Sequence, residues 1–153
     1  MKINEILESV KSGKISTSSA KKLLTLYSIE EVENFAKIDI NRSKRRGVPE
    51  VIFAETKELE DTKKIIKRTL DKTNLVIVSR IKKDDYKKII IFAKTLKVKV
   101  ETGKNSSTVL LFKKPIKFHG GKVGIMTAGT SDIGVAEEAR LMCQAMNCQC
   151  ITS

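Results

Sequence analysis

The stretch VGIMTAGTSDIGVAEEA, which spans Val123 to Ala139, decides the fold class. A short apolar run meets small residues, then Ser131 and Asp132, and then a helical pattern. This order is typical of a strand that ends at a ligand, because doubly wound α/β proteins bind ligands where helices begin beyond the carboxyl ends of parallel strands. The stretch predicts a strand over 123–127 and a helix over about 133–146.

The turn between this strand and helix has the chemistry of an anion site. Gly129 would let a ligand approach the backbone, and the N–H groups from Thr130 onward would point at an anion. Asp132 could accept hydrogen bonds from ribose hydroxyls. The alternative is that Ser131 or Asp132 only caps the helix and no ligand binds. The turn matches neither G-x-G-x-x-G nor Walker A, so its pattern leaves both interpretations open.

The whole chain reads as an α/β protein in four segments. Residues 1–38 hold N-terminal helices, 39–113 a small α/β domain, 114–121 a linker, and 122–153 the start of a parallel α/β sheet. A single strand–helix–strand unit is not a fold, because parallel strands need neighbours and cover on both faces. We therefore expect that this last segment is cut short or is completed by another chain.

Three local patterns support this division. Ser28 and Glu31 have the spacing of a capping box and predict a third short helix in the first segment. In the second segment, Thr56 is the expected cap of a helix that runs to about Leu70. The apolar run Leu75–Val78 predicts a strand covered on both faces, and helical and strand patterns alternate after it.

The positive charge of the chain is unevenly spread. The net charge is +12, and residues 1–120 hold 28 Lys and Arg against 15 Asp and Glu, whereas 121–153 hold 2 against 3. A basic part favours an anionic partner such as a phosphate-bearing metabolite or nucleic acid. The alternative is a solvated surface, because most lysines alternate with acids on predicted helices. Two Tyr and no Trp give little support to base stacking, so nucleic acid is the disfavoured partner.

Neither a membrane span nor a metal site is expected. No apolar run approaches the ~18–20 residues that span a bilayer, and the N-terminus lacks the apolar region of a signal peptide, so we expect a cytoplasmic protein. The three cysteines, Cys143, Cys148 and Cys150, have a spacing that suits zinc poorly, and no histidine lies near them in the sequence. We expect reduced, partly buried thiols.

Charged residues near predicted strands are further candidates for binding. Arg42 and Arg45 belong to a basic run, and a guanidinium fork suits phosphate or carboxylate, although the run also fits a surface loop. Glu50 could orient one of those arginines. Arg80 follows the apolar strand, a position where a charge often faces a site. His119 lies in the linker and is expected to be structural or exposed.

Two motifs resemble the LarB family, the nickel-pincer nucleotide biosynthesis carboxylases with a PurE-like (AIR carboxylase-like) C-terminal domain. One motif is T-A-G-T-S-D at Thr127–Asp132. The resemblance covers most of the chain and is collinear. The other motif, D-x-x-R-x-x-R-x-G-x-P-E-V, is carried here by Asp39, Arg42, Arg45, Gly47, Pro49, Glu50 and Val51.

The resemblance implies an activity and a set of contacts. LarB-like enzymes carboxylate the pyridinium ring of nicotinic acid adenine dinucleotide with CO2 or bicarbonate and hydrolyse its phosphoanhydride. It implies no covalently bound cofactor, allows Mg2+ to accompany the dinucleotide, and implies a homo-oligomer, an octamer in the full-length family. The resemblance matches Ser131 and Asp132 to a Ser-Asp pair in the nucleotide turn of PurE proteins, and it implies that 122–153 begin a flavodoxin-like parallel sheet of the PurE type. Together with residue type and position, it gives the predicted substrate-binding residues, which are Gly129, Thr130, Ser131, Asp132, Arg42, Arg45, Glu50 and Arg80.

The chain departs from the family at its end. There the family continues into D-V-G-V-A-G, a His-Arg pair and a nucleophilic cysteine, and the three cysteines here do not occupy that place. We therefore expect an N-terminal part of a LarB-like protein that is inactive alone. One alternative is a PurE-type aminoimidazole ribonucleotide carboxylase or mutase, disfavoured because Gly129 stands where PurE proteins have serine. The other is a basic nucleic-acid-binding module without enzyme activity.

Overall fold

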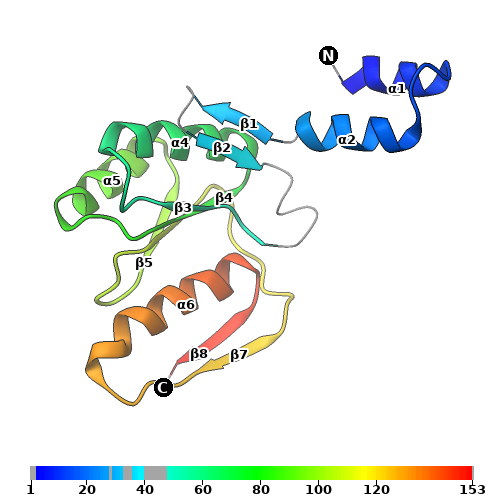
Figure 1. Cartoon of the computed structure of the whole chain (residues 1–153). Helices are drawn as coiled ribbons and strands as arrows, with labels where there is room; N and C mark the ends of the chain where they lie inside the picture. Colours follow the sequence, from blue (N-terminus) through cyan, green and yellow to red (C-terminus); the bar gives the residue numbers. More distant parts are fainter. Residues whose placement is uncertain (1–2, 28, 33–35, 40–47, 153) are drawn as a thin grey trace. The chain divides into compact units, whose positions relative to one another are not determined.

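The computed structural model describes residues 3–27, 29–32, 36–39 and 48–152 (Figure 1). Contacts along the chain define two compact units, which divide after Asn41. Within the described ranges, no helix is long and apolar enough to cross a membrane. Both units contain helices and strands, and the second contains a mixed sheet, so the chain is of the α/β class.

The first unit begins with a pair of helices. Helix α1 (Ile3–Lys11) and helix α2 (Thr17–Tyr27) confirm the two predicted helices. Ile6 and Ala20 are buried between them. The Oγ atom of Ser16 accepts a hydrogen bond from the backbone N–H of Ser19 at 3.1 Å, so the Ser16 hydroxyl caps the start of α2.

The helix predicted to start at Ser28 is wrong. The residues that follow Ser28 form strand β1 (Ile29–Val32), which pairs antiparallel with strand β2 (Ala36–Asp39). The capping-box spacing is a local signal, and an isolated helix of a few residues is marginal. Strand pairing supplies backbone hydrogen bonds to a partner, and the β-branched Ile29 and Val32 suit a strand.

A four-stranded mixed sheet forms the centre of the second unit. Its strands are β3 (Val51–Phe53), β4 (Leu75–Ser79), β5 (Lys99–Thr102) and β6 (Val109–Phe112), in the order β3-β4-β6-β5. Strands β3 and β4 are parallel, and the other two pairs are antiparallel. The predicted strand in the apolar run after Asn74 is confirmed.

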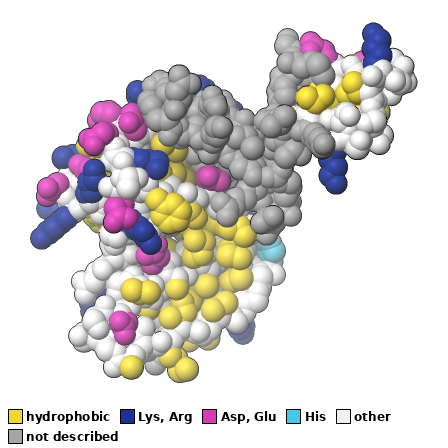
Figure 2. Space-filling view, in the orientation of Figure 1, with side chains coloured by type: hydrophobic (Ala, Val, Ile, Leu, Met, Phe, Trp, Pro, Cys, Tyr) yellow, Lys and Arg dark blue, Asp and Glu magenta, His cyan; other side chains and the backbone are white. Residues whose placement is uncertain are grey.

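Two helices, α4 (Leu59–Lys72) and α5 (Lys83–Thr95), pack against this sheet. The cap predicted at Thr56 is wrong, because Thr56 lies in a turn and Glu58 precedes the helix without a side-chain cap bond. Figure 2 shows side chains of both charge signs over these helices. Ion pairs within them, such as Lys63–Glu60 at 2.7 Å, favour the solvated-surface interpretation of the basic charge.

Helix α6 (Ile133–Ala145) covers the other face of the sheet and contacts strands β7 (Lys122–Ile125) and β8 (Gln149–Thr152) (Figure 1). Strands β7 and β8 are parallel neighbours, as the strand–helix–strand pattern predicts. The helix thus buries one side against a sheet built from earlier residues, and β4 is covered on both faces. The core between helix and sheet consists of Ile77, Leu110, Phe112, Leu141 and Ala145.

Candidate functional site

The predicted ligand turn lies between β7 and α6. Thr130–Asp132 form a single 3-10 turn, and all three side chains are exposed. Gly129 has an extended backbone with φ −148°, and a Cβ placed there would meet only the Oγ atom of Ser131, at 3.7 Å. The space beside Gly129 is therefore open to a ligand, although the local backbone does not itself require glycine.

The capping alternative for this turn requires a side-chain hydrogen bond that is not formed. Asp132 occupies the N-cap position of α6 without a side-chain cap bond. The Oγ atom of Ser131 instead donates to Oδ1 of Asp132 at 3.5 Å. Both polar groups therefore face solvent at the amino end of a 13-residue helix, where the helix dipole favours an anion.

Two further candidates lie at opposite ends of the parallel pair β3–β4. Arg80 follows β4 at the carboxyl end of the pair, and its Nη1 donates to Oε2 of Glu55 at 3.2 Å. Glu50 precedes β3 at the opposite end, where it is half-buried. The structure therefore does not bring Glu50 and Arg80 together. Arg42 and Arg45 lie outside the described residues.

The two candidate regions are not directly joined. No hydrogen bond or ion pair within residues 48–152 links Arg80 to Ser131 or Asp132. One residue before Arg80, Oγ of Ser79 on β4 donates to Oε1 of Glu138 on α6 at 2.5 Å. The structure thus offers an exposed turn and a separate strand-end cluster.

The sequence did not predict a buried series of hydrogen bonds between polar side chains. The hydroxyl of Thr108 donates to that of Ser79 at 3.3 Å, and Ser79 in turn donates to Glu138. Thr108 and Ser79 are fully buried, so each needs a partner when water is removed. Their partners lie 29 and 59 residues away along the chain, and no local pattern in the sequence signals such a bond.

Arg140 is a second residue that only the fold explains. Its guanidinium donates to Glu137 on α6 at 3.0 Å, to Glu101 on β5 at 3.4 Å and to the carbonyl oxygen of Thr102 at 3.1 Å. The bonds to Glu101 and Thr102 hold α6 against β5, one of the two edge strands of the sheet. Arg140 is therefore engaged in structure and is not a candidate for substrate binding.

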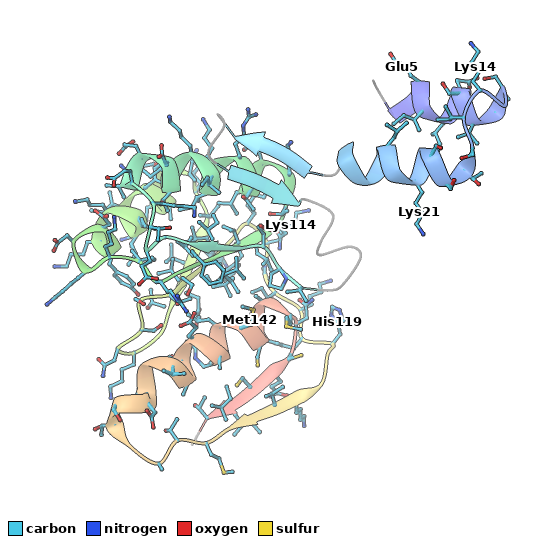
Figure 3. All side chains as sticks on the ribbon, in the orientation of Figure 1. Glu5, Lys14, Lys21, Lys114, His119 and Met142 are labelled. Carbon is cyan, nitrogen blue, oxygen red and sulfur yellow. The ribbon has the colours of Figure 1, made fainter. Side chains whose placement is uncertain are left out.

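The three cysteines are free and half-buried. Burial raises the pKa of the Cys143 thiol, and the neighbouring thiols of Cys150 and Cys148 raise it further. Among the described residues, no group of three or more His, Cys, Asp and Glu could hold a metal ion. His119 is exposed on the segment before β7, as expected; Figure 3 labels it together with Met142 of α6.

The raised pKa of Cys143 predicts slow alkylation. The folded state keeps this thiol protonated, so iodoacetamide should modify it more slowly near pH 8 than in the urea-unfolded chain. The contribution of the protonated Cys143 thiol to the stability of the folded state is fully present below the ordinary thiol pKa. It is lost as pH rises through the raised pKa. Mass spectrometry of Cys143 across pH measures this. If the pH midpoint of Cys143 alkylation in the folded chain lay at or below that in the unfolded chain, the raised pKa would be contradicted.

Comparison with known proteins places this geometry in a family. The model of the LarB/PurE-like N-terminal domain matches residues 29–109, from β1 into β6. The chain belongs to this family. The match includes the arginine motif and the parallel pair β3–β4 and ends before the turn at Thr130–Asp132.

A relative extends the likeness over the whole chain. An uncharacterized protein from Methanocaldococcus jannaschii is 33% identical over 155 residues, which cover 99% of this chain. The chain spans 60% of the length of that relative. The similarity therefore includes the turn and helix α6 that lie beyond the family match.

Proposed function

We propose that this LarB-family chain serves the carboxylation of a pyridinium nucleotide. The substrate would be nicotinic acid adenine dinucleotide, with CO2 or bicarbonate as the carbon source, and Mg2+ would enter with the dinucleotide. The observation that carries the proposal is the family match over residues 29–109, because it includes the arginine motif in sequence and strands β3, β4 and β5 of the sheet that supports α6. The LarB/PurE-like domain supports membership of a family related to carboxylases.

The chain's own part in the reaction would be binding. Ser131 and Asp132 are exposed at the amino end of α6, where hydroxyl and carboxylate oxygens can accept hydrogen bonds from ribose hydroxyls. Backbone N–H groups of the first helical turn favour a phosphate oxygen. Arg42, Arg45, Glu50 and Arg80 stay proposals as substrate contacts, and bond-making residues are not assigned to this chain.

A turnover assay on the full-length Methanocaldococcus relative tests the activity. With nicotinic acid adenine dinucleotide, bicarbonate and Mg2+, we expect release of AMP and a dicarboxylated pyridinium mononucleotide. An alanine substitution at the position aligned with Asp132 should weaken dinucleotide binding by about 10–100-fold, the loss expected for a charge-assisted hydrogen bond. An unchanged dissociation constant would remove Asp132 from the site, and absence of product would overturn the proposed reaction.

The same assay separates the purine alternative. A PurE-type enzyme would accept aminoimidazole ribonucleotide in place of the dinucleotide. Gly129 favours the pyridinium substrate, since the open space beside it lacks the side-chain hydroxyl that PurE proteins use on phosphate. Turnover of the imidazole and not of the dinucleotide would reverse this assignment.

A further inference from the structure

An aromatic ring lies exposed at the carboxyl end of the parallel strand pair. Phe53 is the last residue of β3, and 54% of its surface is accessible, whereas its neighbour Ile52 is 4% accessible. Phe53 pairs in register with Ser79, the last residue of β4. Exposing a ring of this size forgoes the stabilisation that its full burial would give.

Arg80 is held over this ring by an unusual backbone. Its φ is +54°, in the left-handed region that side chains larger than Asn and Asp seldom adopt. The guanidinium carbon lies 5.7 Å from the centroid of the Phe53 ring, and Nη1 bonds Glu55 at 3.2 Å. Exposed aromatic surface and a left-handed arginine each cost stability, and such local costs gather at functional sites.

The segments that present these two side chains are tied together. The backbone N–H of Ala54 donates to the carbonyl of Ser79 at 2.9 Å, which extends the parallel pairing beyond Phe53. The Nζ atom of Lys82 donates to the carbonyl of Lys57 at 3.1 Å, so the two segments beyond the strands are joined again. The ring and the guanidinium are therefore positioned before any ligand arrives, which lowers the entropic cost of binding.

We propose that Phe53 and Arg80 form a binding site for a planar aromatic carboxylate. The ligand ring stacks on the exposed part of Phe53. The ligand carboxylate accepts hydrogen bonds from the guanidinium N–H groups of Arg80 on the side away from Glu55. Of the guanidinium nitrogens of Arg80, only Nη1 donates to a side chain of residues 48–152. The arginine side chain is 63% accessible. Flat rings bind aromatic faces, and guanidinium forks bind carboxylates in bidentate fashion.

This inference deepens the proposed function and rests on it, because the nicotinate ring of the proposed dinucleotide substrate is a planar aromatic carboxylate and Arg80 is one of its proposed contacts. The site lies within the matched family domain, at strands β3 and β4, whereas the proposed nucleotide turn follows β7. A binding measurement on this chain tests it, so its failure and the failure of turnover in the full-length relative are separate results.

The test is a titration of the 153-residue chain, followed by amide NMR signals, with benzoate, cyclohexanecarboxylate and benzamide. Benzoate should shift signals near Phe53 and Arg80 in a saturable way. Cyclohexanecarboxylate keeps the charge without the flat ring and should bind about 2–10-fold more weakly, as expected for lost stacking. Benzamide keeps the ring without the charge and should bind about 10–100-fold more weakly. Equal affinity within either pair, or no saturable shift, would overturn the site.

Two variants locate the binding. Arg80→Asn removes the guanidinium at a residue type that tolerates positive φ, and Phe53→Leu removes the ring but keeps an apolar side chain. Both should weaken benzoate binding by at least about 5-fold. The control Ile91→Ala alters an equally exposed apolar residue, 63% accessible, on α5 and should leave benzoate affinity unchanged. Unchanged affinity in Arg80→Asn would refute the proposal, and if a variant misfolds, the three-ligand comparison on the unaltered chain still decides.

Discussion

Leu141→Ala is expected to lower the free energy of unfolding of the second unit by about 2–5 kcal/mol. Leu141 is fully buried, and it packs with Ile77, Leu110 and Phe112 of the four-stranded sheet. The truncation removes apolar contacts and leaves a cavity between helix and sheet, and a close-packed interior closes such a cavity only in part. Urea denaturation followed by circular dichroism measures the loss.

Val135→Ala is the matched control for this change. Val135 lies on the same helix but is 70% exposed, so its truncation should change the stability by less than about 0.5 kcal/mol. Hydrogen exchange at Val76 and Val78 of β4 adds a second measurement. If Leu141→Ala left exchange in β4 unchanged, α6 and the sheet would not share one core.

Gly134→Ala is expected to destabilise the second unit by about 1–3 kcal/mol, although alanine is the better helix former by about 1 kcal/mol. A Cβ at Gly134 would overlap the carbonyl oxygen of Asn105, which belongs to the segment between β5 and β6. A backbone oxygen cannot swing aside as a side chain can. The first turn of α6 would therefore have to move away from the sheet.

The control here is Gly124→Ala on β7. A Cβ at Gly124 meets nothing within 4 Å, and its φ is not positive, so the substitution should leave stability within about 0.5 kcal/mol. Thermal unfolding of the two variants side by side gives the comparison. A gain in stability for Gly134→Ala, the result that helix propensity alone predicts, would show that α6 does not sit against Asn105 in solution.

Much of the fold could be predicted because its signals are local. The run at Leu75–Val78 is apolar at every position, and such a run suits a strand covered on both faces, which β4 is. The strand–turn–helix order after Lys122 likewise predicted β7 and α6 to within a few residues. The capping-box prediction at Ser28 failed because strand pairing, a contact between segments, outweighed a spacing of three residues.

Only part of the candidate site could be predicted from the sequence. Residue type and position after a strand directed attention to Arg80 and Asp132, because carboxyl ends of parallel strands are where ligands bind. The aromatic partner of Arg80 was not predicted. Phe53 has the composition of a core residue, and only the edge position of β3 leaves it exposed.

The sequence by itself determined the α/β class, most of the element order, and the family to which the arginine motif pointed. The tertiary structure alone decided that α6 packs against a sheet made from earlier residues. The contacts are made by Leu141, by Arg140, and by Gly134 with the backbone of Asn105. Periodicity and spacing record which face of a segment is apolar, whereas the partner of that face depends on contacts between residues far apart in the chain. Those contacts follow from packing, and no local pattern encodes them.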